Sequence, residues 1–283
     1  MRILMLGSAA ILLSGCSFLG IGGSKKDYTN YNPQTGYYGQ QQAVHTAAST
    51  KCHTGNCLAR WNLEGGVGPS FNVGKNIITS GRTNNVDGTN FNSISFDDAY
   101  ERGVRAELGG SYALSPNRKV MLLGHYEQAD SNGSQDWGTI NGEQLTGALS
   151  DYEAWGAELG LRQYFKPMNG IVLNSVRPYV EGRAGVSRVN DIGVQNTQLG
   201  GATFSAAEVP LYRNSWVGTA AGLVGVETPL TRYSTIGLET GIRYQGGLKS
   251  DTSVLGAGTP LGGLNNNRGR VSVPVTLRGR YRF

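Results

Sequence analysis

Apolar and polar side chains alternate along the last stretch of the chain. From Val271 to Phe283 the odd-numbered positions are apolar, glycine or aromatic, whereas the even-numbered positions carry Ser, Pro, Thr or Arg. A β-strand places successive side chains on opposite faces, so a strand between two different environments shows this period of two. The pattern predicts a long strand over residues 270–283.

Seven further stretches show the same alternation, which brings the expected strands to eight. They cover residues 61–71, 101–114, 119–127, 154–165, 176–186, 216–227 and 234–244. Long and short links alternate strictly between them, and the short links contain Pro, Asn or Gly, which favour turns. We therefore predict an all-β fold, an eight-stranded antiparallel up-and-down barrel with short turns at one end and long loops at the other.

Alternation alone does not say which face points outward, because a soluble eight-stranded barrel such as a lipocalin turns its apolar face inward. The aromatic residues of the apolar face favour the opposite arrangement. Trp61 to Phe71 and Trp155 to Phe165 are each separated by ten positions. Ten residues of a tilted strand climb about 25 Å, which is the height of the lipid-facing band of a membrane barrel. The aromatic residues fall at two levels, Trp61, Tyr112, Phe165, Tyr281 and Phe283 at one and Phe71, Tyr126, Trp155, Trp216 and Tyr244 at the other.

The polar face carries charges of both signs in the middle of the strands. Eight strands leave an interior just wide enough for side chains. Ionised groups buried there are tolerated only when they pair with one another. We therefore expect an interior charge network of Arg105, Glu107, Glu158, Arg162, Glu181, Arg183, Glu239, Arg243, Arg278 and Arg280.

The chain ends in Tyr281-Arg282-Phe283, which resembles the C-terminal aromatic signal by which outer-membrane barrels are recognised for assembly. The glycine spacing of the preceding residues departs slightly from that pattern. Residues 61–283 resemble the small eight-stranded outer-membrane barrels typified by the OmpA transmembrane domain. The resemblance implies a transmembrane β-barrel that contacts the barrel-assembly machinery in transit.

The first residues have the parts of an export signal, with Arg2 followed by an apolar stretch from Ile3 to Leu13. This stretch is too short to span a bilayer as a helix. Leu-Ser-Gly-Cys, ending at Cys16, resembles the bacterial lipobox, in which the cysteine receives a diacylglycerol and becomes the new N-terminus. Ser17 stands where an aspartate would imply retention in the inner membrane, so the resemblance implies lipoprotein sorting to the outer membrane of a Gram-negative bacterium.

The expected organisation has three parts. Residues 1–15 form the signal peptide, residues 16–60 a flexible periplasmic tether without periodicity, and residues 61–283 the barrel. In an oxidising periplasm Cys52 and Cys57 are expected to form a disulfide that closes a small loop, which leaves Cys16 for the lipid. A metal site that also uses His53 is the alternative, but three ligands so close in sequence are sterically poor.

The sequence holds few candidates for catalysis. Lipid A acyl-modifying enzymes and aspartate-type proteases occur on such barrels, and they need a nucleophile, or paired carboxylates with a histidine base, near the outer rim. His125, with Glu127 and Glu101 nearby, is the one candidate, and its position on the polar face favours an interior hydrogen-bonded histidine instead. We therefore expect no enzyme, no catalytic or cofactor-binding residues and no bound metal.

The remaining alternatives concern transport and partners. A barrel of eight strands filled with Arg and Glu is expected to be plugged, although a narrow pore stays the alternative function. The formal net charge of +5 is too small over this length to indicate nucleic-acid binding. The expected partners are outer-membrane lipid and, through the long polar loops, a surface ligand such as a glycan, a host molecule or a neighbouring protein. Solvated loops without a ligand are the other interpretation, and we expect a structural or surface-interaction role.

Overall fold

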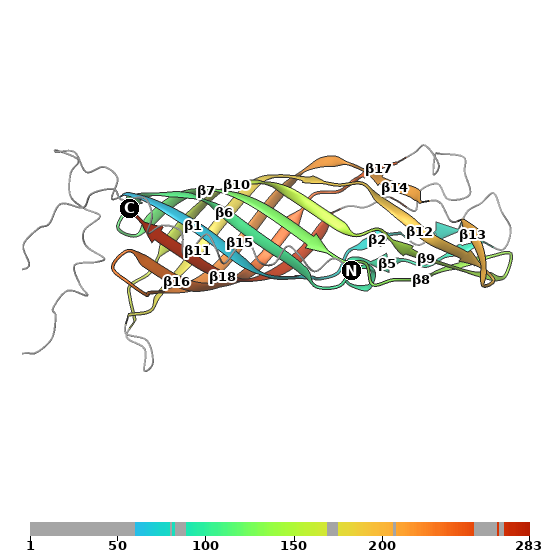
Figure 1. Cartoon of the computed structure of the whole chain (residues 1–283), viewed down its shortest axis with the longest axis horizontal. Helices are drawn as coiled ribbons and strands as arrows, with labels where there is room; N and C mark the ends of the chain where they lie inside the picture. The colour runs from blue at the N-terminus through green and yellow to red at the C-terminus, as the bar shows by residue number, and fades with distance from the viewer. Residues whose placement is uncertain are drawn as a thin grey trace, which may run out of the picture. The chain divides into compact units, whose positions relative to one another are not determined.

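The computed structural model describes residues 60–79, 81–82, 89–168, 175–205, 208–251, 265 and 269–283. Eight long antiparallel strands close into a barrel in which chain neighbours pair and the first strand meets the last (Figure 1). The predicted closed eight-stranded up-and-down barrel is therefore confirmed. Its strands are β1 (Trp61–Asn72), β6 (Gly103–Ser115), β7 (Arg118–Ala129), β10 (Tyr152–Tyr164), β11 (Arg177–Val189), β15 (Ser215–Pro229), β16 (Ser234–Gln245) and β18 (Arg270–Arg282).

The predicted signal peptide of residues 1–15 and nearly all of the predicted tether lie outside the described residues. The same is true of the expected lipid-attachment residue Cys16 and of the expected disulfide partners Cys52 and Cys57.

The barrel closes through the pairing of β1 with both of its neighbours. Leu63 lies opposite Tyr281 of β18 on one side and opposite Gly110 of β6 on the other. A closed ladder has no edge strand, so its backbone N–H and C=O groups are paired within the barrel.

The two faces of each barrel strand follow the predicted alternation. Leu122 and Leu159 lie opposite each other on neighbouring strands, and each is 60% exposed on the outer surface. Their neighbours along the strands, Leu123 and Glu158, are buried inside. The barrel is thus apolar outside and largely polar inside. A water-soluble protein has the opposite distribution of apolar and polar side chains.

The described parts of the long links form secondary structure of their own, which their polar composition did not predict. They hold short strands and one helical turn, and together with the barrel residues beneath them we call them the cap. Its elements are β2 (Asn76–Ile78), β3 (Gly81–Arg82), β4 (Asn90–Phe91), β5 (Ile94–Ser95), α2 (Phe96–Ala99), β8 (Gln135–Ile140), β9 (Glu143–Leu149), β12 (Ile192–Leu199), β13 (Ala202–Ser205), β14 (Val209–Arg213) and β17 (Lys249–Ser250).

One sheet of the cap runs in the order β17-β14-β12-β9-β8-β4-β3, with β13 paired to β12. This order repeats the order of the barrel strands to which these elements are joined, so the sheet continues the barrel wall beyond its end (Figure 1). A separate pair, β2 with β5, lies beside α2 in the first long link.

The cap has an apolar core of its own. Ile77, Ile78 and Phe96 of the first long link are at most 1% exposed, and they belong to one cluster with Leu149 and Tyr212 from other links. Each link alone is too short to bury such side chains. Four links that meet over the barrel end remove them from water together, which stabilises the cap as one unit.

The turn α2 begins at a capping serine. The Ser95 hydroxyl accepts a hydrogen bond from the Asp98 N–H at 3.2 Å and donates one to the Asp98 carboxylate at 2.5 Å. Ser at the N-cap with acidic residues in the first turn is a favourable start for a helix. Asp98 therefore serves local structure, and it places Phe96 in the apolar core.

Glycine at position 225 makes room for a tyrosine inside the barrel. A Cβ there would lie 2.4 Å from Cζ of Tyr179 and 2.5 Å from its hydroxyl oxygen. We expect Gly225→Ala to lower the free energy of unfolding by roughly 1–3 kcal/mol, because it forces that ring out of its place. Urea unfolding in lipid vesicles measures the change. Gly222→Ala is the matched control, since a Cβ at Gly222 meets nothing within 4 Å on the same strand, and equal losses in both variants would contradict the expectation.

Candidate functional site

Ionised side chains of both signs fill the barrel. All ten residues expected in the interior charge network lie there, and each is less than a tenth exposed. Together with five further buried charges, they form what we call the ionic interior. It consists of Glu64, Glu107, Glu127, Glu158, Glu181, Glu227, Glu239, Lys119, Arg105, Arg162, Arg183, Arg243, Arg270, Arg278 and Arg280.

Glu107 on β6 lies at the centre of the ionic interior. Its carboxylate is 2.8 Å from the Arg105 guanidinium and 2.7 Å from that of Arg183. Arg278 lies at 2.6 Å and Arg243 at 3.4 Å. Four arginines from four strands thus converge on one carboxylate, and the pairing offsets the large cost of burying each charge.

Arg162 on β10 is fully buried and forms ion pairs with several glutamates of the ionic interior. Its guanidinium is 2.5 Å from the Glu181 carboxylate and 3.2 Å from that of Glu64. It also lies over the Tyr179 ring, 4.2 Å from the ring centroid. Ion pairing and cation–π contact together hold this charge away from water.

Arg270 joins the ionic interior to the cap. Its guanidinium binds the Glu127 carboxylate at 2.6 Å and the Asn72 side-chain oxygen at 2.5 Å. It also lies 4.4 Å from the centroid of the Tyr152 ring, which belongs to the apolar core. The polar interior and the apolar cap are therefore in direct contact.

Five members of the ionic interior were not among the ten residues expected there, namely Glu64, Lys119, Glu127, Glu227 and Arg270. Glu64 follows the outward-facing Leu63, and Arg270 precedes Val271. Strand parity places both on the polar face, so the signal was present. Tyr179 was also missed as an interior residue, because a tyrosine on either face of a strand fits the alternation.

The end of the barrel with the short turns is closed by basic and aromatic side chains. Lys119 lies with its Nζ 5.4 Å from the centroid of the Tyr164 ring. The Arg177 guanidinium donates hydrogen bonds to the Pro116 carbonyl at 2.8 Å and to the Asn117 side chain at 2.7 Å. These contacts tie the first short turn to the neighbouring hairpin and fill the mouth at this end.

His125 is enclosed within the ionic interior. Its Nε2 is 3.2 Å from the Ser187 hydroxyl, and its Nδ1 is 4.0 Å from the Glu158 carboxylate. The order serine, histidine, carboxylate is that of a hydrolase triad, but Ser187 is only 2% exposed and Glu158 is already paired with arginines. Glu127 is also paired, and Glu101 is exposed outside the barrel. The geometry fits an interior hydrogen-bonded histidine.

Among the buried groups of the cap, Tyr100 packs on the Phe96 and Tyr152 rings, with centroids 6.2 and 5.9 Å away. Burial raises the pKa of Tyr100 well above its ordinary value, so the phenol stays protonated.

Tyr212 of the third long link contacts the first long link, because its hydroxyl donates a hydrogen bond to the Ile77 carbonyl.

Replacing Tyr212 by phenylalanine removes this hydrogen bond and leaves a buried carbonyl with one partner fewer. We expect the cap to lose about 1–3 kcal/mol of local stability, while the barrel keeps its own. Hydrogen exchange of residues 76–100, followed by mass spectrometry, measures the loss. Tyr233→Phe at an exposed turn is the control, and unchanged exchange in the Tyr212 variant would contradict the expectation.

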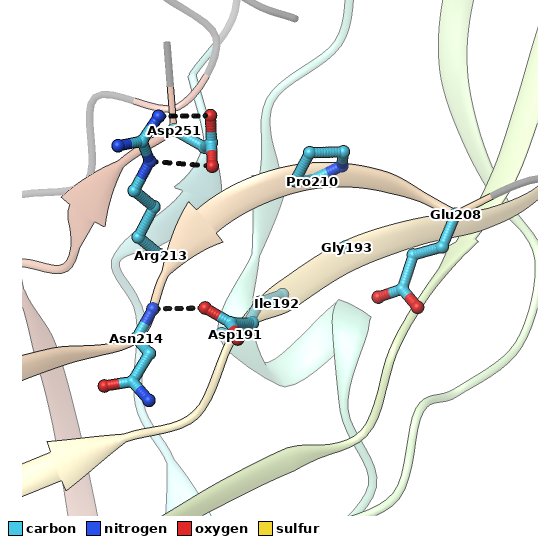
Figure 2. Close-up of a pocket in the computed structure, with 8 residues that line it drawn as sticks. All are labelled: Asp191, Ile192, Gly193, Glu208, Pro210, Arg213, Asn214 and Asp251. Carbon is cyan, nitrogen blue, oxygen red and sulfur yellow. Dashed lines mark hydrogen bonds and ion pairs between the residues drawn. The ribbon is translucent and has the colours of Figure 1, made fainter. Parts of the chain in front are cut away.

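An open cleft of about 650 Å³ lies between elements of the cap. The Arg213 guanidinium donates hydrogen bonds to the Asp251 carboxylate at 2.8 and 3.1 Å. Figure 2 shows this pair and the Asn214 N–H that donates to Asp191. This contact with Asp251 raises the pKa of Arg213. The lining residues are Asp191, Ile192, Gly193, Glu208, Pro210, Arg213, Asn214 and Asp251.

The side chains that line this cleft can form hydrogen bonds and ion pairs with a ligand. Its lining offers carboxylates and a guanidinium but no histidine or cysteine. Within the described part of the chain, no group of three or more His, Cys, Asp or Glu side chains is placed to hold a metal ion. Over the same residues, no helix is long and apolar enough to cross a membrane.

Comparison with known proteins gives structural similarities only. No family model matches the sequence, and no curated protein matches it. Neisserial surface protein A is 11% identical, with 79% of this chain and 97% of that protein covered and a TM-score of 0.40. The attachment invasion locus protein Ail of Yersinia pestis is 13% identical, with 80% and 99% covered and a TM-score of 0.35.

The outer membrane protease OmpT of Escherichia coli is similar to the same degree. It is 9% identical, with 80% of this chain and 97% of OmpT covered and a TM-score of 0.35. These identities and TM-scores are too low to show a shared family or a shared function.

Proposed function

We propose that the protein spans the outer membrane of a Gram-negative bacterium as a lipid-anchored β-barrel with a non-enzymatic structural or surface-interaction role. In this arrangement the barrel wall contacts lipid, the ionic interior stays sealed from both sides, and the cap faces the outside of the cell. Cys16 carries the acyl anchor and the residues up to 60 tether it to the barrel.

One observation carries the membrane part of the proposal, which is the continuous apolar outer surface of the barrel. Soluble monomers rarely expose contiguous apolar patches larger than a few hundred Å². Here every barrel strand exposes large apolar side chains. They include Leu63, Val67, Val104, Leu108, Leu122, Leu159, Leu161, Val180, Val186, Val224, Leu238, Ile242 and Leu277.

Aromatic side chains border this surface at both ends, as they do in membrane barrels. At one end Trp61 contacts Tyr112, with ring centroids 5.0 Å apart, and at the other end Trp155 contacts Trp216 at 5.3 Å. Amphipathic rings of this kind favour the boundary between lipid and water.

The same geometry supports a role other than a pore. The ionic interior occupies the middle of the barrel, and the apolar core of the cap covers one mouth. Among the described residues, ion pairs therefore occupy the barrel lumen, which in a porin is filled with water. Planar bilayers that contain the protein are therefore expected to stay at the conductance of pure lipid, and stepwise ion currents would instead favour the narrow pore.

The surface-interaction part of the proposal rests on the cap. Its cleft, lined by Asp191, Glu208 and Arg213, is a concave polar surface on an ordered platform, which suits a hydroxyl- or amine-bearing ligand. Binding of a surface ligand that is lost in Arg213→Ala, with the barrel intact, would support this role.

Labelling tests the anchor and the barrel together. Cells grown with radioactive palmitate are expected to label the wild type and not Cys16→Ala. Both proteins should change gel mobility on heating, because a folded barrel resists unheated detergent. Palmitate label that persists without Cys16 would contradict the anchor, and a protein that is soluble without detergent would contradict the barrel's place in the membrane.

A further inference from the structure

The two ends of the barrel differ in charge. The short links at residues 116–117, 165–176 and 230–233 contain Lys166 and Arg232 but no Asp or Glu. Arg60, Arg118, Arg177 and Arg282 lie beside these links, at the ends of the barrel strands. We call these six residues the basic rim. Glu64 and Glu227, the carboxylates of the ionic interior toward this end, are paired with Arg162 and Arg280.

The opposite end has the reverse balance. The four long links at residues 73–102, 130–151, 190–214 and 246–269 together carry eleven Asp or Glu and six Lys or Arg. Charge is therefore distributed along the barrel axis, with an excess of negative charge in the cap and of positive charge at the basic rim.

The basic rim also lies at the level of one aromatic ring. Arg60 precedes Trp61, Lys166 follows Phe165, and Arg232 precedes Tyr233. Arg282 stands between Tyr281 and Phe283. The five aromatic side chains are 40–61% exposed. Since such rings favour the headgroup region, the adjacent cations are at the height of lipid phosphates.

The hydrogen bonds of Arg118 and Arg177 go to neutral groups, so they do not cancel the positive charge of these two side chains. Arg118 donates to the neutral Gln163 side chain at 2.8 Å, and the Arg177 guanidinium binds neutral carbonyl and amide oxygens. The tether cannot neutralise the rim either, because residues 17–59 hold Lys25, Lys26 and Lys51 against a single Asp27.

From this arrangement we infer that the basic rim binds anionic phospholipid headgroups, of the phosphatidylglycerol type, in the leaflet at the short-link end. The inference rests on the proposed membrane location. Each Lys or Arg near an anionic surface strengthens attraction, so several cations at one height select anionic lipid and fix which end of the barrel faces that leaflet.

The test compares lipid preference in two triple variants. Full-length protein is reconstituted into phosphatidylcholine vesicles with brominated phosphatidylcholine, and unbrominated phosphatidylglycerol is titrated to relieve the quenching of tryptophan fluorescence. Arg118→Gln/Lys166→Gln/Arg232→Gln removes three exposed cations of the rim. Lys75→Gln/Arg102→Gln/Lys249→Gln removes three exposed cations at the opposite end, so both variants lose the same charge.

We expect the wild type and the variant with Lys75, Arg102 and Lys249 replaced to bind phosphatidylglycerol in preference to phosphatidylcholine. In the variant with Arg118, Lys166 and Arg232 replaced, the ratio of the two affinities should fall at least about fivefold. The preference should also weaken as salt is raised. Equal losses in both variants, or no preference in an inserted wild type, would overturn the inference while the membrane location stands. So would a rim that binds a soluble anionic polymer but shows no lipid preference. Failure to insert into any vesicle would instead overturn the proposed function.

Discussion

Replacing Leu159 by arginine is expected to lower the free energy of unfolding in lipid vesicles by about 2–4 kcal/mol. Leu159 lies near the middle of β10, points outward and is 60% exposed. A guanidinium at this depth must be carried into the hydrocarbon, where water no longer solvates it. Equilibrium unfolding in urea with vesicles of fixed composition measures the loss.

The control is the same substitution at Leu230, which is 68% exposed in the turn after β15. At the boundary with water the arginine keeps its hydration, so the expected loss is about 0–1 kcal/mol. If the outer face of the barrel met water, both variants would be nearly neutral. Equal effects at the two positions would therefore contradict the lipid-facing orientation.

Glu107→Gln is expected to have the other large effect, a loss of about 3–5 kcal/mol. The substitution keeps the shape of the side chain and opens no cavity. It removes the negative charge on which Arg105, Arg183, Arg243 and Arg278 converge. The four arginines then repel one another with less compensating negative charge, and no water reaches them to screen the repulsion.

Two companions make the result specific. Glu101→Gln changes an exposed glutamate outside the barrel and should leave stability within about 0.5 kcal/mol of the wild type. Glu107→Gln combined with Arg243→Met removes one charge of each sign and should recover part of the loss. A double variant whose loss is the simple sum of the two single losses would show that these groups do not interact.

Strand parity was sufficient to orient the barrel residues. Leu159 faces outward and Arg162 inward, as the period of two predicts, because each strand lies between two environments along its whole length. Parity says only which face a side chain occupies. That Arg183 meets Glu107 depends on strands far apart in sequence and on their register, which no single stretch specifies.

The cap was not foreseen for a related reason. Trp137 and Leu149 stand among Gly, Asn, Ser and Thr, so their surroundings predict exposed loops. They are buried because four separate links meet over the barrel end and share one apolar core. Such a core depends on contacts between links, and it leaves no periodic pattern in any one of them.

Nitroxide labels at Ala157, Ala184 and Ala220 test whether the outer face of the barrel contacts lipid. The measurement is the rate at which each label collides with oxygen and with a water-soluble nickel chelate. All three point outward in the barrel, and Asn141 in the β8–β9 turn serves as the water-exposed reference. With the native cysteines replaced by serine, the barrel labels are expected to collide more often with oxygen, which concentrates in lipid, than with a water-soluble nickel chelate. Higher collision rates with the chelate at all three positions would mean that the apolar wall faces water.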